Sequence, residues 1–160
     1  MLRANAGQAP RAALLGSRLG VALPRDPCAL CDSAGGDLLW RDEFCRVVLV
    51  DQRDYPGLCR VILQRHIAEM TDLSPAERTR FMNAVFATET ALRETLHPDK
   101  INLASLGNLT PHLHWHVIPR YSGDRHFPLS IWAEPVRADA PQRAAPDRDT
   151  LVAVLKRRLV

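Results

Sequence analysis

The chain has 160 residues, of which 46% are hydrophobic and 24% charged, and this profile predicts one globular domain. The net charge of +3 comes from the two ends, because between Asp26 and Asp149 14 basic residues face all 18 acidic ones. That acidic body argues against a nucleic-acid-binding surface, and the lack of any run of about 18 apolar residues argues against a membrane span.

The N-terminal 25 residues predict a flexible extension, since the first 20 are basic, free of acids and rich in Ala and Leu. The same composition is typical of a transit peptide, and that alternative stays open. The cysteines are too few for a disulfide scaffold in a chain of this length, so we expect a reducing compartment, the cytoplasm.

Strands are predicted at Leu38–Trp40, Cys45–Asp51 and Cys59–Gln64, where β-branched residues gather. Turn-forming residues at 54–57 indicate that the second and third strands form a hairpin. We expect Cys45 and Cys59, which lie on these strands, to be small buried apolar residues.

The strongest helix signal begins at Ser74, where Ser-Pro-Ala-Glu is a capping box with proline at the first helical position. Apolar residues then recur at steps of three and four from Phe81 to Leu96, and Pro98 ends the helix. Two further strands, Lys100–Ser105 and His112–Ile118, follow. One long helix among mostly antiparallel strands predicts an α+β fold.

Residues 133–149 contain mainly Pro, Ala and charged residues, which predicts a linker, and residues 150–160 predict a short C-terminal helix. Apolar residues at four-residue steps form the buried stripe expected of that helix: Leu151, Leu155 and Leu159.

Alternation in the strand His112–Ile118 places His112, His114 and His116 on one face and apolar residues on the other. Imidazoles in this pattern bind Zn²⁺ or Cu²⁺, or attack phosphorus as nucleophiles, and the spacing alone does not choose between the two. The flanking residues favour an anionic ligand, because the loop Gly107–Thr110 offers backbone N–H groups and a hydroxyl, and Arg120 adds a cation.

The run His-x-His-x-His followed by two apolar residues resembles the signature of the histidine-triad superfamily of nucleotide hydrolases and transferases. The order of hairpin, His66, long helix, Asn102, Gly107–Thr110 loop and histidine strand extends the resemblance over residues 26–132. The details are closer to the bacterial members that resemble dinucleoside polyphosphate hydrolases. The resemblance implies a five-stranded antiparallel sheet with one long helix, and a homodimer.

It also implies cleavage at the α-phosphate of a dinucleoside polyphosphate or nucleoside phosphoramidate, without a cofactor for catalysis. His114 would be the nucleophile and form a nucleotidyl-histidine, His112 would support it through its backbone carbonyl, and His116 would contact the leaving oxygen. Substrate-binding positions follow by match to the family: Asp51 for the ribose hydroxyls, and Asn102, Gly107, Asn108 and Thr110 for the phosphates. The family usually has Gln where this chain has Asn108.

Cys28-Ala-Leu-Cys31 has the spacing of one edge of a tetrahedral zinc site, and the resemblance implies a structural zinc completed by His66 and His112. Two ordinary thiols are the alternative. His126 and Trp132 lie in a segment that either closes over the substrate or packs as a surface loop on the sheet edge. Tyr55 and Leu58 are candidates for lining the pocket that binds the nucleotide base. A non-catalytic nucleotide-binding or metal-binding module remains the alternative function.

Overall fold

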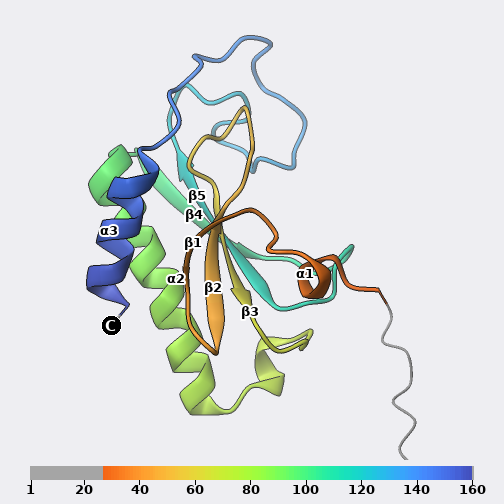
Figure 1. Ribbon diagram of the computed structural model, residues 1–160. Coiled ribbons are helices and arrows are strands. Elements are labelled where there is room, and N and C mark those ends of the chain that lie inside the picture. The colour runs from red at the N-terminus through yellow and green to blue at the C-terminus, as the bar shows by residue number, and fades with distance from the viewer. Residues whose placement is uncertain (1–26, 160) are drawn as a thin grey trace, which may run out of the picture.

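The structure is a computed structural model that describes residues 27–159, and the predicted N-terminal extension lies outside the described residues. Five antiparallel strands form one sheet in the order β1-β2-β3-β5-β4. Helices α2 and α3 lie on one side of this sheet and the short helix α1 lies on the other (Figure 1). The elements are α1 (Ala29–Asp32), β1 (Asp37–Arg41), β2 (Cys45–Leu49), β3 (Cys59–Leu63), the 3-10 helix η1 (Met70–Asp72), α2 (Pro75–Leu96), β4 (Lys100–Ser105), β5 (His114–Arg120) and α3 (Arg148–Arg158).

The α+β fold predicted from the sequence is confirmed, with five antiparallel strands, one long helix and a short C-terminal helix. The predicted capping box forms at the start of α2: the Ser74 hydroxyl accepts from the Glu77 amide, and the Glu77 carboxylate accepts from the Ser74 amide. The helix ends at Leu96, one residue before His97, which adopts a left-handed conformation. Local chemistry therefore sets both ends of this helix.

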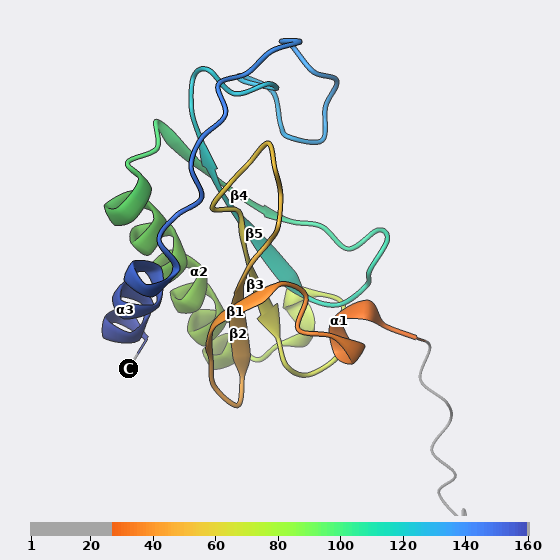
Figure 2. The same cartoon turned by 45° about the horizontal axis from the view of Figure 1, so that its top comes forward.

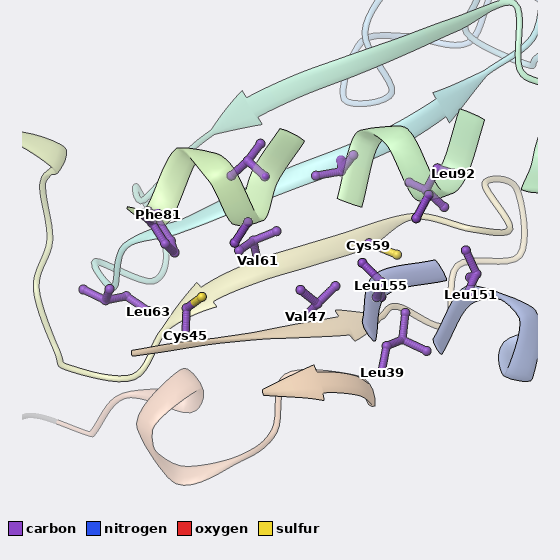
Figure 3. Packing of buried hydrophobic residues seen from close by; sticks show 14 of the residues in the cluster. Leu39, Cys45, Val47, Cys59, Val61, Leu63, Phe81, Leu92, Leu151 and Leu155 are labelled. Atoms are coloured by element: carbon purple, nitrogen blue, oxygen red, sulfur yellow. The ribbon is translucent and has the colours of Figure 1, made fainter. Parts of the chain in front are cut away.

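The hydrophobic core lies between the sheet and helices α2 and α3 (Figure 3). Alternation directs every second strand residue toward α2, so that Val47, Val61 and Val117 pack beneath Phe81. Leu151 and Leu155 of α3 are both 1% exposed, as the apolar stripe predicts, whereas Leu159 is only partly buried. This packing fixes one face of the sheet and leaves the opposite face to carry polar side chains.

The hairpin between β2 and β3 is confirmed, with Cys45 opposite Leu63 and Leu49 opposite Cys59. Its connection is longer than a tight turn and closes through the Val50 amide, which donates to the Leu58 carbonyl over 2.8 Å. Gly57 has a φ of +94°, a conformation that L side chains rarely adopt. The connection projects beyond the sheet, next to the segment that follows β5 (Figure 2).

Loops make up residues 121–147, between β5 and α3, so α3 begins and ends two residues before the helix predicted at 150–160. Arg137 ties this segment together by donating to the carbonyls of Asp124 and Phe127. The domain boundaries proposed from the sequence stay predictions. Among the described residues, no helix has the length and apolar character needed to cross a membrane.

Candidate functional site

The histidine strand begins later than the sequence predicted, because β5 starts at His114 and not at His112. The His112 amide donates to the Thr110 carbonyl over 2.8 Å, and the Leu113 amide donates to the Ile67 carbonyl over 2.6 Å. These bonds hold the first histidine in a turn before the strand ladder. The predicted strand over His112–Ile118 was therefore wrong by two residues at each end.

His114 is held in one tautomer by the chain itself. Its Nδ1 lies 2.6 Å from the backbone oxygen of His112, and a carbonyl oxygen only accepts hydrogen bonds. The ring proton therefore sits on Nδ1, which leaves Nε2 with an unshared electron pair. The side chain is 7% exposed, and this burial lowers its pKa below the usual value for histidine, as does the charge of Arg60. The neutral, nucleophilic form of His114 is favoured at neutral pH.

His116 lies on the same face of β5, and its ring centroid is 4.9 Å from that of His114 in an edge-to-face arrangement. Burial and, to a smaller extent, the neighbouring charges of His114 and Arg60 together lower the pKa of His116 to about 4. Trp132 borders the opposite side of His116, with ring centroids 5.3 Å apart. Trp132 is half exposed, so an aromatic surface from the segment after β5 lies beside the histidine pair.

His112 belongs to a different cluster, on the side of the sheet that α1 covers. The two thiols of Cys28 and Cys31 and one ring nitrogen each from His66 and His112 all lie within 4.8 Å of one another. The predicted set of four side chains thus comes together in space. Within residues 27–159, the group of ligating side chains that could hold a metal contains His112 and neither His114 nor His116.

The geometry of this cluster fits a tetrahedral metal. A zinc ion with Zn–S of about 2.3 Å and Zn–N of about 2.0 Å sets its ligating S and N atoms about 3.5 Å apart. His112 Nδ1 lies 3.5 Å from Cys28 Sγ and 3.4 Å from Cys31 Sγ, and His66 Nδ1 lies 3.3 Å from Cys31 Sγ. His112 Nε2 donates to the Leu63 carbonyl over 2.7 Å, so its Nδ1 carries the lone pair that a metal needs.

Arg46 holds the CxxC segment against the sheet. Its guanidinium donates to the carbonyls of Leu30, Ser33 and Ala34 and, over 2.8 Å, to the side chain of Gln64. Four acceptors satisfy this buried cation. The segment that carries Cys28 and Cys31 is consequently anchored by protein contacts alone.

The loop proposed to hold phosphate, Gly107–Thr110, leads directly into His112. Asn108 is exposed on it, and Thr110 and Gly107 are partly buried. Asn102, on β4, lies two residues from Ala104, which is the register partner of His116. Strand β4 therefore borders the histidine pair on one side, and the loop contacts His112 through Thr110.

Arg120 does not supply the free cation that the sequence suggested. It is 2% exposed and donates to the Asp124 carboxylate over 3.0 Å, to Asn102 Oδ1 over 2.7 Å and to the Leu129 carbonyl over 3.0 Å. Because its charge is neutralised by Asp124, Arg120 organises the segment after β5. It also donates to the side-chain oxygen of Asn102, which orients the amide nitrogen of Asn102 away from Arg120.

Asp51 follows β2 and is exposed in the wall of a cavity of about 670 Å³, together with Gly36, Val50 and Pro146. Tyr55 and Leu58 do not line a base pocket: both are 3% exposed and pack on Ile118 in a small apolar cluster.

His126 is buried, and its ring bonds to the Tyr55 hydroxyl. It therefore anchors the segment after β5 and does not face a ligand.

Arg60 was not identified as a site residue from the sequence. It lies on β3 directly opposite His116, and its Nη1 donates to the Gly35 carbonyl over 3.3 Å. Its buried Nε has no hydrogen-bond partner within residues 27–159. The alternation of Cys59–Leu63 does place Arg60 on the non-core face, but only the pairing of β3 with β5 shows that this is the histidine face.

An α+β sheet domain with this histidine strand defines a histidine-triad protein. The HIT domain model matches residues 34–123, and the chain belongs to that family. The chain is 30% identical over 78 residues to an AP-4-A phosphorylase of Mycobacterium tuberculosis, covering 45% of this chain and 40% of the relative. It is 30% identical over 95 residues to a bis(5'-nucleosyl)-tetraphosphatase (asymmetrical) of Schizosaccharomyces pombe, covering 56% and 52%. The matches therefore span about half the length of these curated relatives.

Solved structures agree with the family assignment. A histidine triad protein of Marinobacter aquaeolei is 25% identical with a TM-score of 0.64, covering 78% of this chain and 92% of that one. A Zn-bound histidine triad family protein of Mycobacterium smegmatis is 27% identical with a TM-score of 0.53, covering 82% and 92%. The predicted superfamily and its fold are thus confirmed.

Proposed function

We propose that this chain is a nucleotide hydrolase or nucleotidyl transferase that cleaves at the α-phosphate of a dinucleoside polyphosphate or nucleoside phosphoramidate. The observation that carries the proposal is the fixed tautomer of His114, whose Nδ1 proton is bound to the His112 carbonyl and whose Nε2 is left nucleophilic. The tetraphosphatase and phosphorylase names of the curated relatives support the substrate class.

In the first step His114 Nε2 attacks the α-phosphorus, an N–P bond forms, and the P–O or P–N bond to the leaving group breaks with its electron pair. The His112 carbonyl stabilises the positive charge that develops on the ring. His116, adjacent to His114, contacts the bridging or leaving atom. In the second step a water oxygen attacks phosphorus, the N–P bond breaks with its electron pair returning to His114 Nε2, the water proton passes to solvent, and the nucleoside monophosphate is released.

The remaining residues bind substrate in this proposal. Asp51 accepts hydrogen bonds from the ribose hydroxyls; this role rests on the family match, since none of the three histidines lines the cavity that Asp51 borders. Asn108, Gly107 and Thr110 surround the phosphates, with Asn102 at the neighbouring strand. The enzyme acts as a homodimer, which light scattering after gel filtration would measure directly.

We also infer that the Cys28, Cys31, His66 and His112 cluster binds a structural zinc, since its donor set and spacing fit that ion. When bound, zinc would supply a cross-link between α1, the segment after β3 and the turn before β5. Turnover itself needs no metal, because a neutral imidazole attacks phosphorus without one. Activity should therefore survive mild chelation that leaves the fold intact.

The test is a panel of diadenosine tetraphosphate, diadenosine triphosphate and AMP phosphoramidates, with release of AMP as the readout. We expect turnover by the wild-type chain and an acid-labile AMP adduct trapped by rapid quenching. His114→Asn should bind AMP without forming the adduct. Absence of AMP release from every substrate, with AMP still bound, would favour the non-catalytic nucleotide-binding module.

A further inference from the structure

One arginine on each of β2, β3 and β5 projects from the face of the sheet that carries the histidine pair, and the three differ in their partners. Arg46 is satisfied by three carbonyls and Gln64, and Arg120 by Asp124, Asn102 and a carbonyl. Arg60 has a single hydrogen bond of 3.3 Å, to the Gly35 carbonyl. No carboxylate within residues 27–159 forms an ion pair with it.

The lack of partners for the half-buried Arg60 guanidinium is unfavourable for folding when no ligand is bound. A guanidinium has five N–H donors, and burial without partners is unfavourable both for the charge and for each unsatisfied donor. Arg60 is half buried, its Nε is shielded from solvent without a partner, and burial lowers its pKa. An anionic group bound next to Arg60 would satisfy both the charge and the donors.

The neighbour of Arg60 indicates where that anion sits. His116 is its register partner across the β3–β5 pair, and His116 Nδ1 is likewise buried without a hydrogen-bond partner in the described part of the chain. The charge of Arg60 also lowers the pKa of both His114 and His116, which places its guanidinium within electrostatic reach of both rings. Two polar atoms without a partner, Arg60 Nε and His116 Nδ1, therefore belong to register partners on the face of the sheet that carries the proposed nucleophile.

We propose that Arg60 donates hydrogen bonds to the non-bridging oxygens of the phosphate that His114 attacks, which makes Arg60 a further catalytic residue. The inference rests on the proposed function and adds the cation that this function otherwise lacks, because Arg120 is already neutralised. Negative charge spreads over these oxygens in the transition state, and the planar fork of a guanidinium matches their geometry. Arg60 thus contributes to both phosphate binding and the chemical step.

The experiment compares AMP with adenosine, which differ only in the phosphate, by calorimetric titration of the wild type, Arg60→Met, Arg60→Lys and Arg41→Met. Arg41 is exposed at the end of β1, so Arg41→Met is a control for the same change in net charge. We expect Arg60→Met to weaken AMP binding by roughly 10- to 100-fold and to leave adenosine binding unchanged, as charge-assisted hydrogen bonds predict. Arg60→Lys should be intermediate, and Arg41→Met should match the wild type.

Kinetics with an AMP phosphoramidate should show kcat falling in Arg60→Met by more than the loss in AMP affinity. An AMP affinity within about twofold of the wild type in both Arg60 variants would overturn the inference while leaving the proposed function in place. A wild-type chain that binds no AMP would overturn both. Arg60→Lys keeps the charge and the stem, so it provides the comparison if Arg60→Met does not fold.

Discussion

Removal of the metal from the Cys28, Cys31, His66 and His112 cluster is expected to lower the thermal stability substantially. The four proposed ligands come from segments as far apart as residues 28 and 112, so a metal would bind only the folded arrangement. At a metal concentration about 1,000-fold above the Kd, this linkage contributes roughly 4 kcal/mol to the free energy of unfolding. With about 2–4 °C per kcal/mol for a domain of this size, chelation should lower Tm by roughly 8–16 °C.

The assay is thermal unfolding followed by circular dichroism, with and without a chelator, on protein purified without added zinc. Elemental analysis should find about one equivalent of zinc. Cys31→Ser is the matched variant, because Cys31 is exposed and the substitution itself costs little packing. It should melt at the temperature of the chelated wild type and respond no further to chelator. A metal content below about 0.2 equivalents, or an unchanged Tm on chelation, would refute the reasoning.

Three other predictions follow from the site and the fold. His114→Ala should lose more than about 99% of kcat with an unchanged circular dichroism spectrum, and retention of a tenth of the wild-type kcat, about 1.4 kcal/mol of barrier, would contradict the nucleophile assignment. Because the pKa of His116 is about 4 in the folded state, the unfolded chain binds more protons between pH 4 and 6.5, and the free energy of unfolding should fall as pH drops through that window. His116→Gln should remove about 2–3 kcal/mol of this pH dependence, measured by urea unfolding at several pH values. An unchanged dependence of the free energy of unfolding on pH in the variant would argue against it. Gly57→Ala should cost about 1–3 kcal/mol, since φ is +94° there and the added Cβ would lie 2.5 Å from Leu96 Cδ1; an equal urea midpoint would disprove this strain.

The parts of the fold that the sequence predicted well are those governed by local chemistry. The capping box at Ser74 and the apolar periodicity up to Leu96 depend on neighbours within a few residues, and the helix formed there as expected. The β-branched runs also marked β2 and β3 to within two residues at each end. Propensity and pattern act over the same short range in which these elements are stabilised.

The partners of the side chains in the candidate site could not be predicted from the sequence, because they depend on which strands pair and on which loops pack against the sheet. His112 alternates with His114 in the sequence, but only the tertiary structure shows that the CxxC segment covers the end of this face, where it contacts His112. Arg46 and Arg60 occupy equivalent second positions in similar runs, CRVVL and CRVIL, and only the tertiary structure satisfies one and leaves the other short of partners. Arg120 looked available for phosphate because Asp124, four residues later, gave no sign of folding back onto it.

The anchoring of the CxxC segment by Arg46 has a consequence for how metal enters the chain. Cys28 and Cys31 are held by the bonds of Arg46 to the carbonyls around them, and His112 is held by Leu63, all through protein contacts alone. These three ligands are thus preorganised, and exposed His66, in the bend after β3, already lies with its Nδ1 3.3 Å from Cys31 Sγ. Metal loading should then require little folding, and an ion would enter from the exposed side of the cluster, at Cys31 and His66.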